Sequence, residues 1–220
     1  MSGCMALEAA GETLLLHPDR AVLWPARRTV IVADTHFGKS GVFRRHGLAV
    51  PAGSDDHDRR RLSDLIEGAQ ARRLIVLGDF LHAPLEPDGE DARDLQAWAA
   101  ALAIDLRIIA GNHDRGAALQ WTSPVHWHEA DLVEAPFRFT HDASRGCARG
   151  GTLFTLSGHI HPVVRLGGLR RRGPRVPVFW QREGGLVLPA FGLFTGGHLV
   201  APGGADRIFA LGPQRVVRFQ

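Results

Sequence analysis

The sequence predicts an α/β protein in which two β-sheets pack against one another. In the first half, a strand, a loop and a helix follow each other three times, which favours parallel strands joined by right-handed crossovers. After about residue 119 the chain holds only short strand-like runs, separated by turns rich in glycine and proline. We therefore expect a second, mostly antiparallel sheet that packs on the first.

The elements of the first half follow from the spacing of apolar residues. Short apolar runs predict buried strands, whereas apolar residues three and four positions apart predict helices. Ser54 is the expected N-cap of a helix whose first turn carries Asp55 and Asp56. The expected elements are a β-hairpin over 13–24, strands over 29–33, 73–77 and 106–110, and helices over 38–46, 54–68 and 91–102.

The second half is expected to contain strands and turns. No run of helical length and period appears beyond about Leu119, and a short strand is expected around Trp127. The further expected strands cover 137–141, 152–157, 176–180, 186–189, 207–211 and 216–219.

The composition is typical of one globular domain, which we expect to span residues 1–220. Hydrophobic residues make up 45% and charged residues 22%, a balance that excludes a disordered chain. The longest apolar runs fall far short of the ~20 residues that cross a membrane, so no membrane partner is expected. The amino terminus lacks a basic signal region and the two cysteines form no framework pattern, which favours the cytoplasm.

Nearly all of the positive charge is arginine, with Lys39 the single lysine, although the net charge is only +3. Because the planar guanidinium fits phosphate oxygens, the arginine clusters at 59–61, 72–73 and 170–172 with Arg175 could form a face that contacts nucleic acid. Arginine on solvated helix faces, favoured by a GC-rich genome, is the alternative. Composition leaves both interpretations open.

Polar side chains follow several of the predicted strands. Asp34 and His36 come after the strand at 29–33, and in extended backbone residues two apart point to the same side. The other candidates of this kind are Asp79, Asn112, His113, His141, His159 and His161. The carboxyl ends of strands are where open α/β sheets place their ligands, so we expect these groups to form one site.

The chemistry of these side chains predicts a metal site. They offer oxygen and nitrogen ligands without a thiolate, which suits Mn²⁺, Fe or Zn²⁺. So many ligands exceed the needs of one ion, whereas two ions roughly 3.5–4 Å apart could share them through a bridging carboxylate. Asp79 is the natural bridge.

These motifs, D-x-H, G-D, G-N-H-D, a separate His and G-H-x-H, resemble the calcineurin-like metallophosphoesterase family in type and order. The resemblance implies a sandwich of two mixed β-sheets flanked by helices. It also implies one ion on Asp34, His36 and His161, with Asp79 bridging. The ligands that it implies for the second ion are Asn112, His141 and His159.

The resemblance leaves His113 without a metal and implies a role for it in catalysis. A hydroxide that bridges the two ions would attack phosphorus, and the leaving oxygen would then need a proton. His113 is expected to donate this proton, with Asp114 as the partner that orients it. The alternative is a histidine with a structural role beside the site.

A narrower resemblance covers nearly the whole chain. Residues 34–39, 43–44, 78–82 and above all 188–197 look like the bacterial PdeM group, the ligase-associated DNA damage response endonucleases. This implies a Mn²⁺-dependent phosphodiesterase that acts in DNA repair on single-stranded or damaged DNA. It also implies a functional association with a DNA ligase, a helicase and a metallo-β-lactamase-type exonuclease. Thr35, where the group carries an apolar residue, is expected to point outward.

Other interpretations of the sequence remain open. Three residues could contact the substrate or could instead be solvated or hydrogen-bonded loop residues: Lys39, Arg44 and His82. Separately, an exposed edge of the second sheet could mediate a homodimer. The site also fits a phosphoesterase of a small nucleotide or pyrophosphate. A metal-binding scaffold without catalysis, within a repair complex, is the third alternative.

Overall fold

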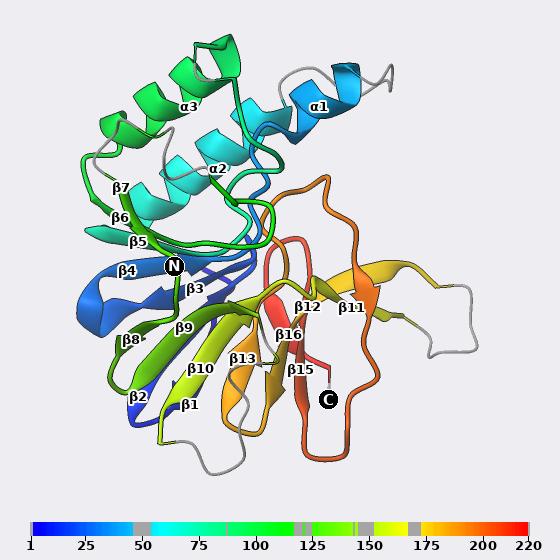
Figure 1. Cartoon of the computed structure of the whole chain (residues 1–220). Coiled ribbons are helices and arrows are strands. Elements are labelled where there is room, and N and C mark those ends of the chain that lie inside the picture. The colour runs from blue at the N-terminus through cyan, green and yellow to red at the C-terminus, as the bar shows by residue number, and fades with distance from the viewer. Residues whose placement is uncertain are drawn as a thin grey trace.

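The chain folds into three layers, as the computed structural model in Figure 1 shows. Helices cover one face of the first sheet, and the second sheet packs on its other face. This arrangement confirms the predicted α/β sandwich, with its helices on one side. The structure describes residues 2–45, 54–86, 88–116, 121, 125–142, 144, 152–166 and 173–219.

The first sheet is mixed, with its strands side by side in chain order. Its strands are β1 (Met5–Ala9), β2 (Glu12–His17), β3 (Ala21–Trp24), β4 (Thr29–Val32), β5 (Arg73–Leu77), β6 (Asp105–Ile109) and β7 (Val125–His128). Strands β1 to β4 pair antiparallel, which confirms the predicted hairpin, and β4 to β7 pair parallel, as the repeated strand, loop and helix predicted. β1 was not predicted.

Three α-helices lie above this sheet in Figure 1. They are α1 (Lys39–Arg45), α2 (Ser54–Gly68) and α3 (Glu90–Ala101), and a 3-10 turn, η1, covers Pro25–Arg27. All three helices were predicted within one residue at each end. None of the described helices has the length and apolarity to cross a bilayer.

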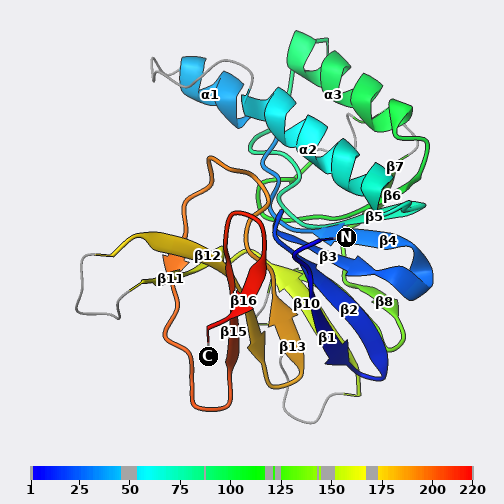
Figure 2. The same cartoon turned by 180° about the vertical axis from the view of Figure 1, so that it is seen from behind.

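The second sheet is also mixed. Its strands are β8 (Leu132–Glu134), β9 (Phe137–Asp142), β10 (Phe154–Gly158), β11 (Pro162–Arg165), β12 (Arg175–Arg182), β13 (Gly185–Val187), β14 (His198–Leu199), β15 (Arg207–Leu211) and β16 (Val216–Arg218). The expected antiparallel pairing holds for most neighbours, but β10 runs parallel to both β9 and β13, and β11 to β14. β11 and β12 form an antiparallel hairpin at one side of this sheet (Figures 1 and 2).

Two apolar cores hold the layers together. One lies between the sheets, where the rings of Trp24 and Phe137 meet edge to face with centroids 4.8 Å apart. The other lies between the first sheet and the helices and includes Phe37 and Leu62. Burial of each such side chain contributes about 1.5–3 kcal/mol. These cores fix the sheets at the edge where the predicted ligands meet.

Candidate metal centre

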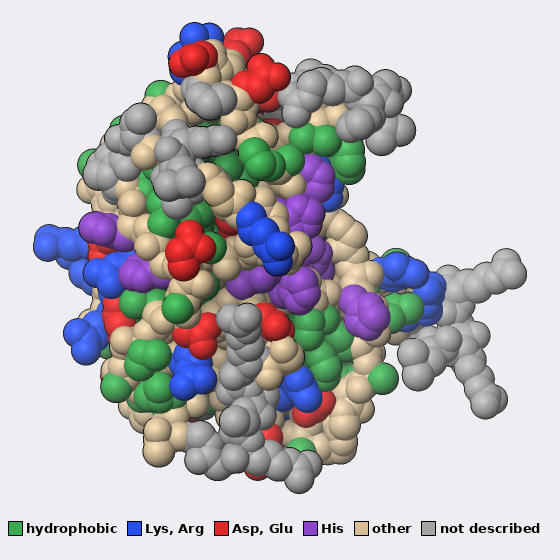
Figure 3. Space-filling model, in the orientation of Figure 1, with side chains coloured by type: hydrophobic (Ala, Val, Ile, Leu, Met, Phe, Trp, Pro, Cys, Tyr) green, Lys and Arg blue, Asp and Glu red, His purple; other side chains and the backbone are tan. Residues whose placement is uncertain are grey.

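The predicted ligands converge where strands of both sheets end. Asp34 and His36 follow β4, Asp79 follows β5, and Asn112 and His113 follow β6. The second sheet contributes His141 in β9, and His159 and His161 after β10. Figure 3 shows histidine side chains gathered in a band across this face. The residues that the sequence singled out therefore lie together where the two sheets meet.

The first ligand group consists of Asp34, His36 and His161. Each offers one ligand atom, and these atoms all lie within 4.8 Å of one another. Nε2 of His161 lies 3.4 Å from Oδ1 of Asp34. A carboxylate and two imidazoles at such spacing can hold one divalent ion.

The second ligand group consists of Asp79, His141 and His159, again within 4.8 Å. Nδ1 of His141 donates to the carbonyl of Leu77 at 3.0 Å, which leaves the Nε2 lone pair facing the site. That Nε2 lies 3.1 Å from Oδ1 of Asn112, so Asn112 joins the group. Two acceptor atoms that face each other, here Nε2 of His141 and Oδ1 of Asn112, are suited to share a cation.

Asp79 lies between the two groups. Its Oδ2 is 3.8 Å from Nε2 of His36 in the first group and 3.6 Å from Nε2 of His141 in the second. The side chain is only 4% exposed. One buried carboxylate oxygen that faces both groups fits the bridging ligand of a two-ion site.

Buried nitrogens without partners provide a test of the metal expectation. Both ring nitrogens of His36 and Nε2 of His161 are buried, and the described residues give them no hydrogen bond. An unmade hydrogen bond of this kind costs about 1–3 kcal/mol, and coordination to a metal removes the cost. The residues present therefore fit two divalent ions.

The protonation of the two histidines agrees with this fit. Burial, helped by the positive potential of His161 and Lys39, lowers the pKa of His36 to about 2, so its ring is neutral. Burial lowers the pKa of His161 as well, but the nearby Asp34 carboxylate outweighs this effect and raises the pKa. A divalent ion would take the place of the proton that Asp34 attracts.

The backbone at the ligands is left-handed. Asp34 and His36 have φ of +53° and +49°, and Asp79, His159 and His161 also have positive φ. The two side chains do meet, but through this turn and not through the extended alternation that we expected from the sequence. Such residues cost about 1–3 kcal/mol each and cluster at functional sites. Bonds from Asp34 N to Gly78 O at 3.1 Å and from His36 N to Asp79 O at 2.9 Å hold the turn.

The glycines of the motifs make room for ligands on neighbouring strands. A Cβ on Gly78 would lie 2.1 Å from Nδ1 of His141, and one on Gly111 would lie 2.2 Å from Oδ1 of Asp79. Neither distance is compatible with a side chain. Glycine before Asp79 and before Asn112 thus lets the two sheets bring their ligands together.

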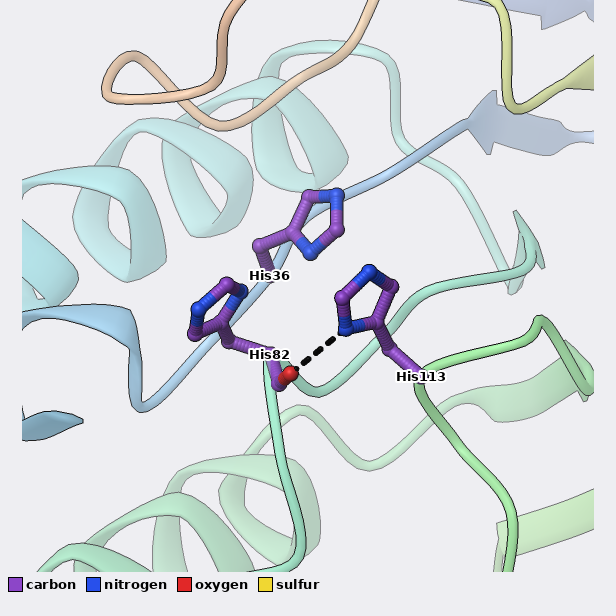
Figure 4. Close-up of side chains that lie close together, drawn as sticks. All are labelled: His36, His82 and His113. Carbon is purple, nitrogen blue, oxygen red and sulfur yellow. Dashed lines mark hydrogen bonds between the residues drawn. The ribbon is translucent and has the colours of Figure 1, made fainter.

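His113 lies at the edge of the ligand groups, facing His36 and His82 (Figure 4). Its Nδ1 donates to the backbone carbonyl of His82 at 2.7 Å, and its Nε2 lies 4.0 Å from Oδ2 of Asp79. The rings of His82 and His113 stack with centroids 5.3 Å apart. The partly exposed His113 ring therefore presents Nε2 to the centre.

The expected partnership of Asp114 with His113 is not what the hydrogen bonds show. The buried Asp114 carboxylate accepts the backbone N–H groups of Phe80, Leu81 and Gly111. Burial raises the pKa of Asp114 in spite of these hydrogen bonds. Asp114 shapes the loops that carry Asp79 and Asn112, and the carbonyl of His82 orients the ring instead.

The candidate substrate contacts differ in how they lie. Nζ of Lys39 lies 5.4 Å from the Phe43 ring centroid, and burial lowers its pKa. His82 borders the site, with a pKa lowered to about 4, mainly by burial and then by the charge of Lys39. Arg44 belongs to α1, but its side chain lies outside the described residues, as does the cluster at 170–172.

Thr35 does not point outward as expected. Its side chain is buried, and its hydroxyl donates to the carbonyl of Phe80 at 2.9 Å. Trp180 likewise makes a contact within the protein, because its Nε1 donates to the carboxylate of Asp206 at 2.9 Å. Phe194 remains 48% exposed on the loop after β13.

The loop after β13 is held by an ion pair and hydrogen bonds that the sequence did not reveal, which we call the clamp. Arg61 of α2 pairs with Asp58 at 2.7 Å and donates to the carbonyl of Phe191. Asp58 also accepts the backbone N–H of Leu193 at 3.1 Å. From the other side, Arg20 donates to the carbonyls of Ala190 and Gly192, each at 3.1 Å. No motif indicates such long-range partners, although the loop itself stood out in the sequence.

Two hollows flank the centre. One, of about 380 Å³, is bordered by Asn112, His141 and His159. The other, of about 230 Å³, is bordered by His161. Both open to solvent, so the centre lies on an accessible surface and not at the bottom of a closed cavity.

The two-sheet fold and the paired Asp and His groups define a metallophosphoesterase. The model of the calcineurin-like phosphoesterase family matches residues 27–209, and the chain belongs to this family.

Among solved structures, Pseudomonas putida nuclease MPE shares 32% identity with a TM-score of 0.79, over 97% of this chain and 100% of that chain. The E. coli phosphoesterase Yfce shares 16% identity with a TM-score of 0.47, over 86% of this chain and 96% of that chain. No curated protein matches the chain.

Proposed function

We propose that the chain is a phosphodiesterase with two divalent metal ions and that it cuts DNA. The observation that carries this proposal is the position of Asp79, whose Oδ2 faces His36 on one side and His141 on the other. One ion would be held by Asp34, His36 and His161, and the other by Asn112, His141 and His159. Asp79 would belong to both.

The oxygen and nitrogen donor set makes Mn²⁺ our first choice, with Fe and Zn²⁺ as alternatives. When bound, such ions make water nucleophilic near neutral pH and offset the charge on phosphoryl oxygens. The protein supplies fixed ligands, because backbone hydrogen bonds hold the turns at Asp34 and His36.

His113 is the proposed proton donor. Its Nδ1–H is committed to the carbonyl of His82, so Nε2 is the atom that faces the reacting groups. In the protonated ring, Nε2 can donate to the leaving oxygen of the diester and attract phosphoryl oxygens at the same time. Asp114 contributes through the loops that it orders.

DNA is the substrate class that we favour. A nuclease is 32% identical over nearly the whole chain, and two hollows open to solvent flank the centre, which supports a long substrate over one enclosed by a lid. A role in bacterial DNA repair, in the cytoplasm and in functional association with a DNA ligase, a helicase and a metallo-β-lactamase-type exonuclease, extends this proposal.

The test is hydrolysis of end-labelled single-stranded, nicked and duplex DNA by metal-stripped protein, with Mn²⁺ then restored. Bis(p-nitrophenyl) phosphate serves as the diester control. We expect metal-dependent cleavage of the control and of at least one DNA. Cleavage of the control alone would replace DNA by a small phosphoester or pyrophosphate. Tight Mn²⁺ binding without hydrolysis of any ester would instead indicate a scaffold.

A further inference from the structure

The second hollow beside the metal centre has the chemistry of a nucleotide-binding site. We call it the His161 hollow. It lies between the hairpin of β11 and β12 and the loop over 189–197, and its volume is about 230 Å³. Pockets that enclose a whole drug-sized ligand measure roughly 300–1,000 Å³, so this one suits a single base with its sugar.

The His161 hollow adjoins the first ligand group directly. His161 lines it and also belongs to the group with Asp34 and His36. The backbone of Gly196, another lining residue, hydrogen-bonds the His161 ring. A molecule in the hollow therefore lies next to any phosphodiester held at the centre.

The walls of the hollow differ in character. Pro162, Val163, Pro177 and Pro189 give an apolar surface, against which a base or sugar can pack. Arg175 lies at the border, is exposed, and has no ion-pair partner among the described residues. Its guanidinium is the group that proteins use most readily for phosphate. Arg20 also lines the hollow, but it holds the loop through Ala190 and Gly192.

The two hollows differ in the charge of the residues that line them. Three carboxylates, Glu129, Asp131 and Asp142, border the larger hollow beside Asn112, together with Arg115. Among the described residues, no carboxylate lines the His161 hollow, whereas Arg20 and Arg175 do. A polyanionic strand is repelled by the first environment and attracted by the second.

We propose that the His161 hollow binds the nucleotide next to the scissile phosphodiester, with Arg175 on its phosphate and the proline wall against its base or sugar. The enzyme would then grip its strand chiefly on one side of the metal centre. This inference rests on the proposed function and extends it to the binding of the substrate.

The first test is the affinity of Arg175→Gln for a fluorescent oligothymidine in the presence of EDTA, measured by anisotropy. Arg207→Gln, at an exposed position of the neighbouring strand β15, is the matched control because it removes the same charge. We expect Arg175→Gln to weaken binding about tenfold and the slope of log Kd against log salt to fall by about 0.7, the value for one phosphate contact on a single strand. The control should change neither quantity.

A second variant probes the wall and not the charge. A Cβ on Gly196 would meet nothing within 4 Å, so Gly196→Leu can fold with its side chain in or over the hollow. We expect weaker binding with an unchanged salt slope, since no phosphate contact is lost. Circular dichroism and the Tm of both variants check the fold.

The outcomes separate this inference from the proposed function. Wild-type affinity and salt slope in Arg175→Gln would overturn the inference, even if the protein cuts DNA. Absence of metal-dependent hydrolysis of every ester, including bis(p-nitrophenyl) phosphate, would overturn the function itself. If the proposed function and this inference both hold, Arg175→Gln should lower kcat/KM on DNA about tenfold relative to kcat/KM on bis(p-nitrophenyl) phosphate.

Discussion

Oδ2 of Asp34 accepts the backbone N–H of His159 at 2.9 Å, although the first residue follows β4 and the second follows β10. This hydrogen bond joins the two sheets at the ligands themselves. The first ligand group depends on the same contact, because His161 follows two residues later. The centre is thus an interface between the layers, and changes on either side should disturb it.

Asp79→Asn should remove the bridge. The asparagine amide has the shape of the carboxylate. It can still accept the backbone N–H of His113, which in the wild type donates to Oδ1 of Asp79 at 2.9 Å, so the fold should survive. Diester hydrolysis should fall by more than the roughly 10- to 100-fold that the loss of an outer ligand partner costs. Titration calorimetry with Mn²⁺ should show weaker binding. Asp105→Asn, at the start of β6, is the control, and near-normal activity of Asp79→Asn would exclude the bridging role.

His113→Ala should remove the proposed proton donor to the leaving oxygen. A general acid contributes about 10²–10⁴-fold, and we expect a loss of that size on DNA. The loss on bis(p-nitrophenyl) phosphate should be much smaller, because p-nitrophenolate leaves without a proton. Mn²⁺ affinity should stay unchanged. Equal losses on both substrates would contradict proton donation, and the exposed His126→Ala provides the control.

Gly111→Ala tests the space beside Asp79. A Cβ there would lie 2.2 Å from Oδ1 of Asp79, so the carboxylate must move and the second ligand group must open. We expect loss of Mn²⁺ binding and of hydrolysis, measured as above. Gly68→Ala, where a Cβ meets nothing within 4 Å, should retain both. A fully active Gly111→Ala would show that the site tolerates this displacement.

Acid should destabilise the metal-free protein. The pKa of His36 is lowered to about 2 and that of His82 to about 4, mainly by burial. The unfolded chain binds these protons near pH 6.5, whereas the folded chain does not, so the free energy of unfolding falls as the pH falls from about 6.5 toward 4. His161, whose pKa is raised, works in the opposite direction.

We therefore expect the Tm of metal-free protein to drop between pH 7 and pH 5. His36→Gln should make the drop shallower, because one group that stays neutral in the folded state is gone. Identical pH slopes for the wild type and this variant would contradict the neutral, buried state of His36.

Asp58→Ala should destabilise the protein without touching the ligands. Burial raises the pKa of Asp58 and lowers that of Arg61, so each charge is costly to bury without the other. Loss of one partner of such a pair costs about 3–5 kcal/mol, which urea unfolding can measure. Asp56→Ala, which breaks the exposed pair with Arg59, should cost at most about 1 kcal/mol. Similar costs for the two variants would argue against the clamp.

The sequence was informative where local patterns decide the structure. The parallel strands β4, β5 and β6 are short apolar runs, and the polar residues that follow them had to meet because parallel strands end at one edge. The histidines of the second sheet were also singled out by their place after predicted strands, and the resemblance to the family assigned them to the two ions.

Partners distant in the chain explain what the sequence could not predict. The left-handed turn at Asp34 and His36 depends on acceptors at Gly78 and Asp79. Asp114 seemed a partner of the adjacent His113, but backbone N–H groups after β5 surround its carboxylate. Strands such as β14, with two residues, pair only because a longer neighbour is already in place.

The hydrogen bond between Asp34 and His159 has a consequence beyond the reaction. An ion that needs ligands from both sheets binds only when the sheets are docked, and it stabilises that state by RT ln(1 + [ion]/Kd). At about a hundred times Kd this amounts to about 2.7 kcal/mol, a large share of the stability of an ordinary domain. Without the metal the equilibrium constant for unfolding would rise about a hundredfold, so starvation for that metal would expose the protein to degradation as well as stop its activity.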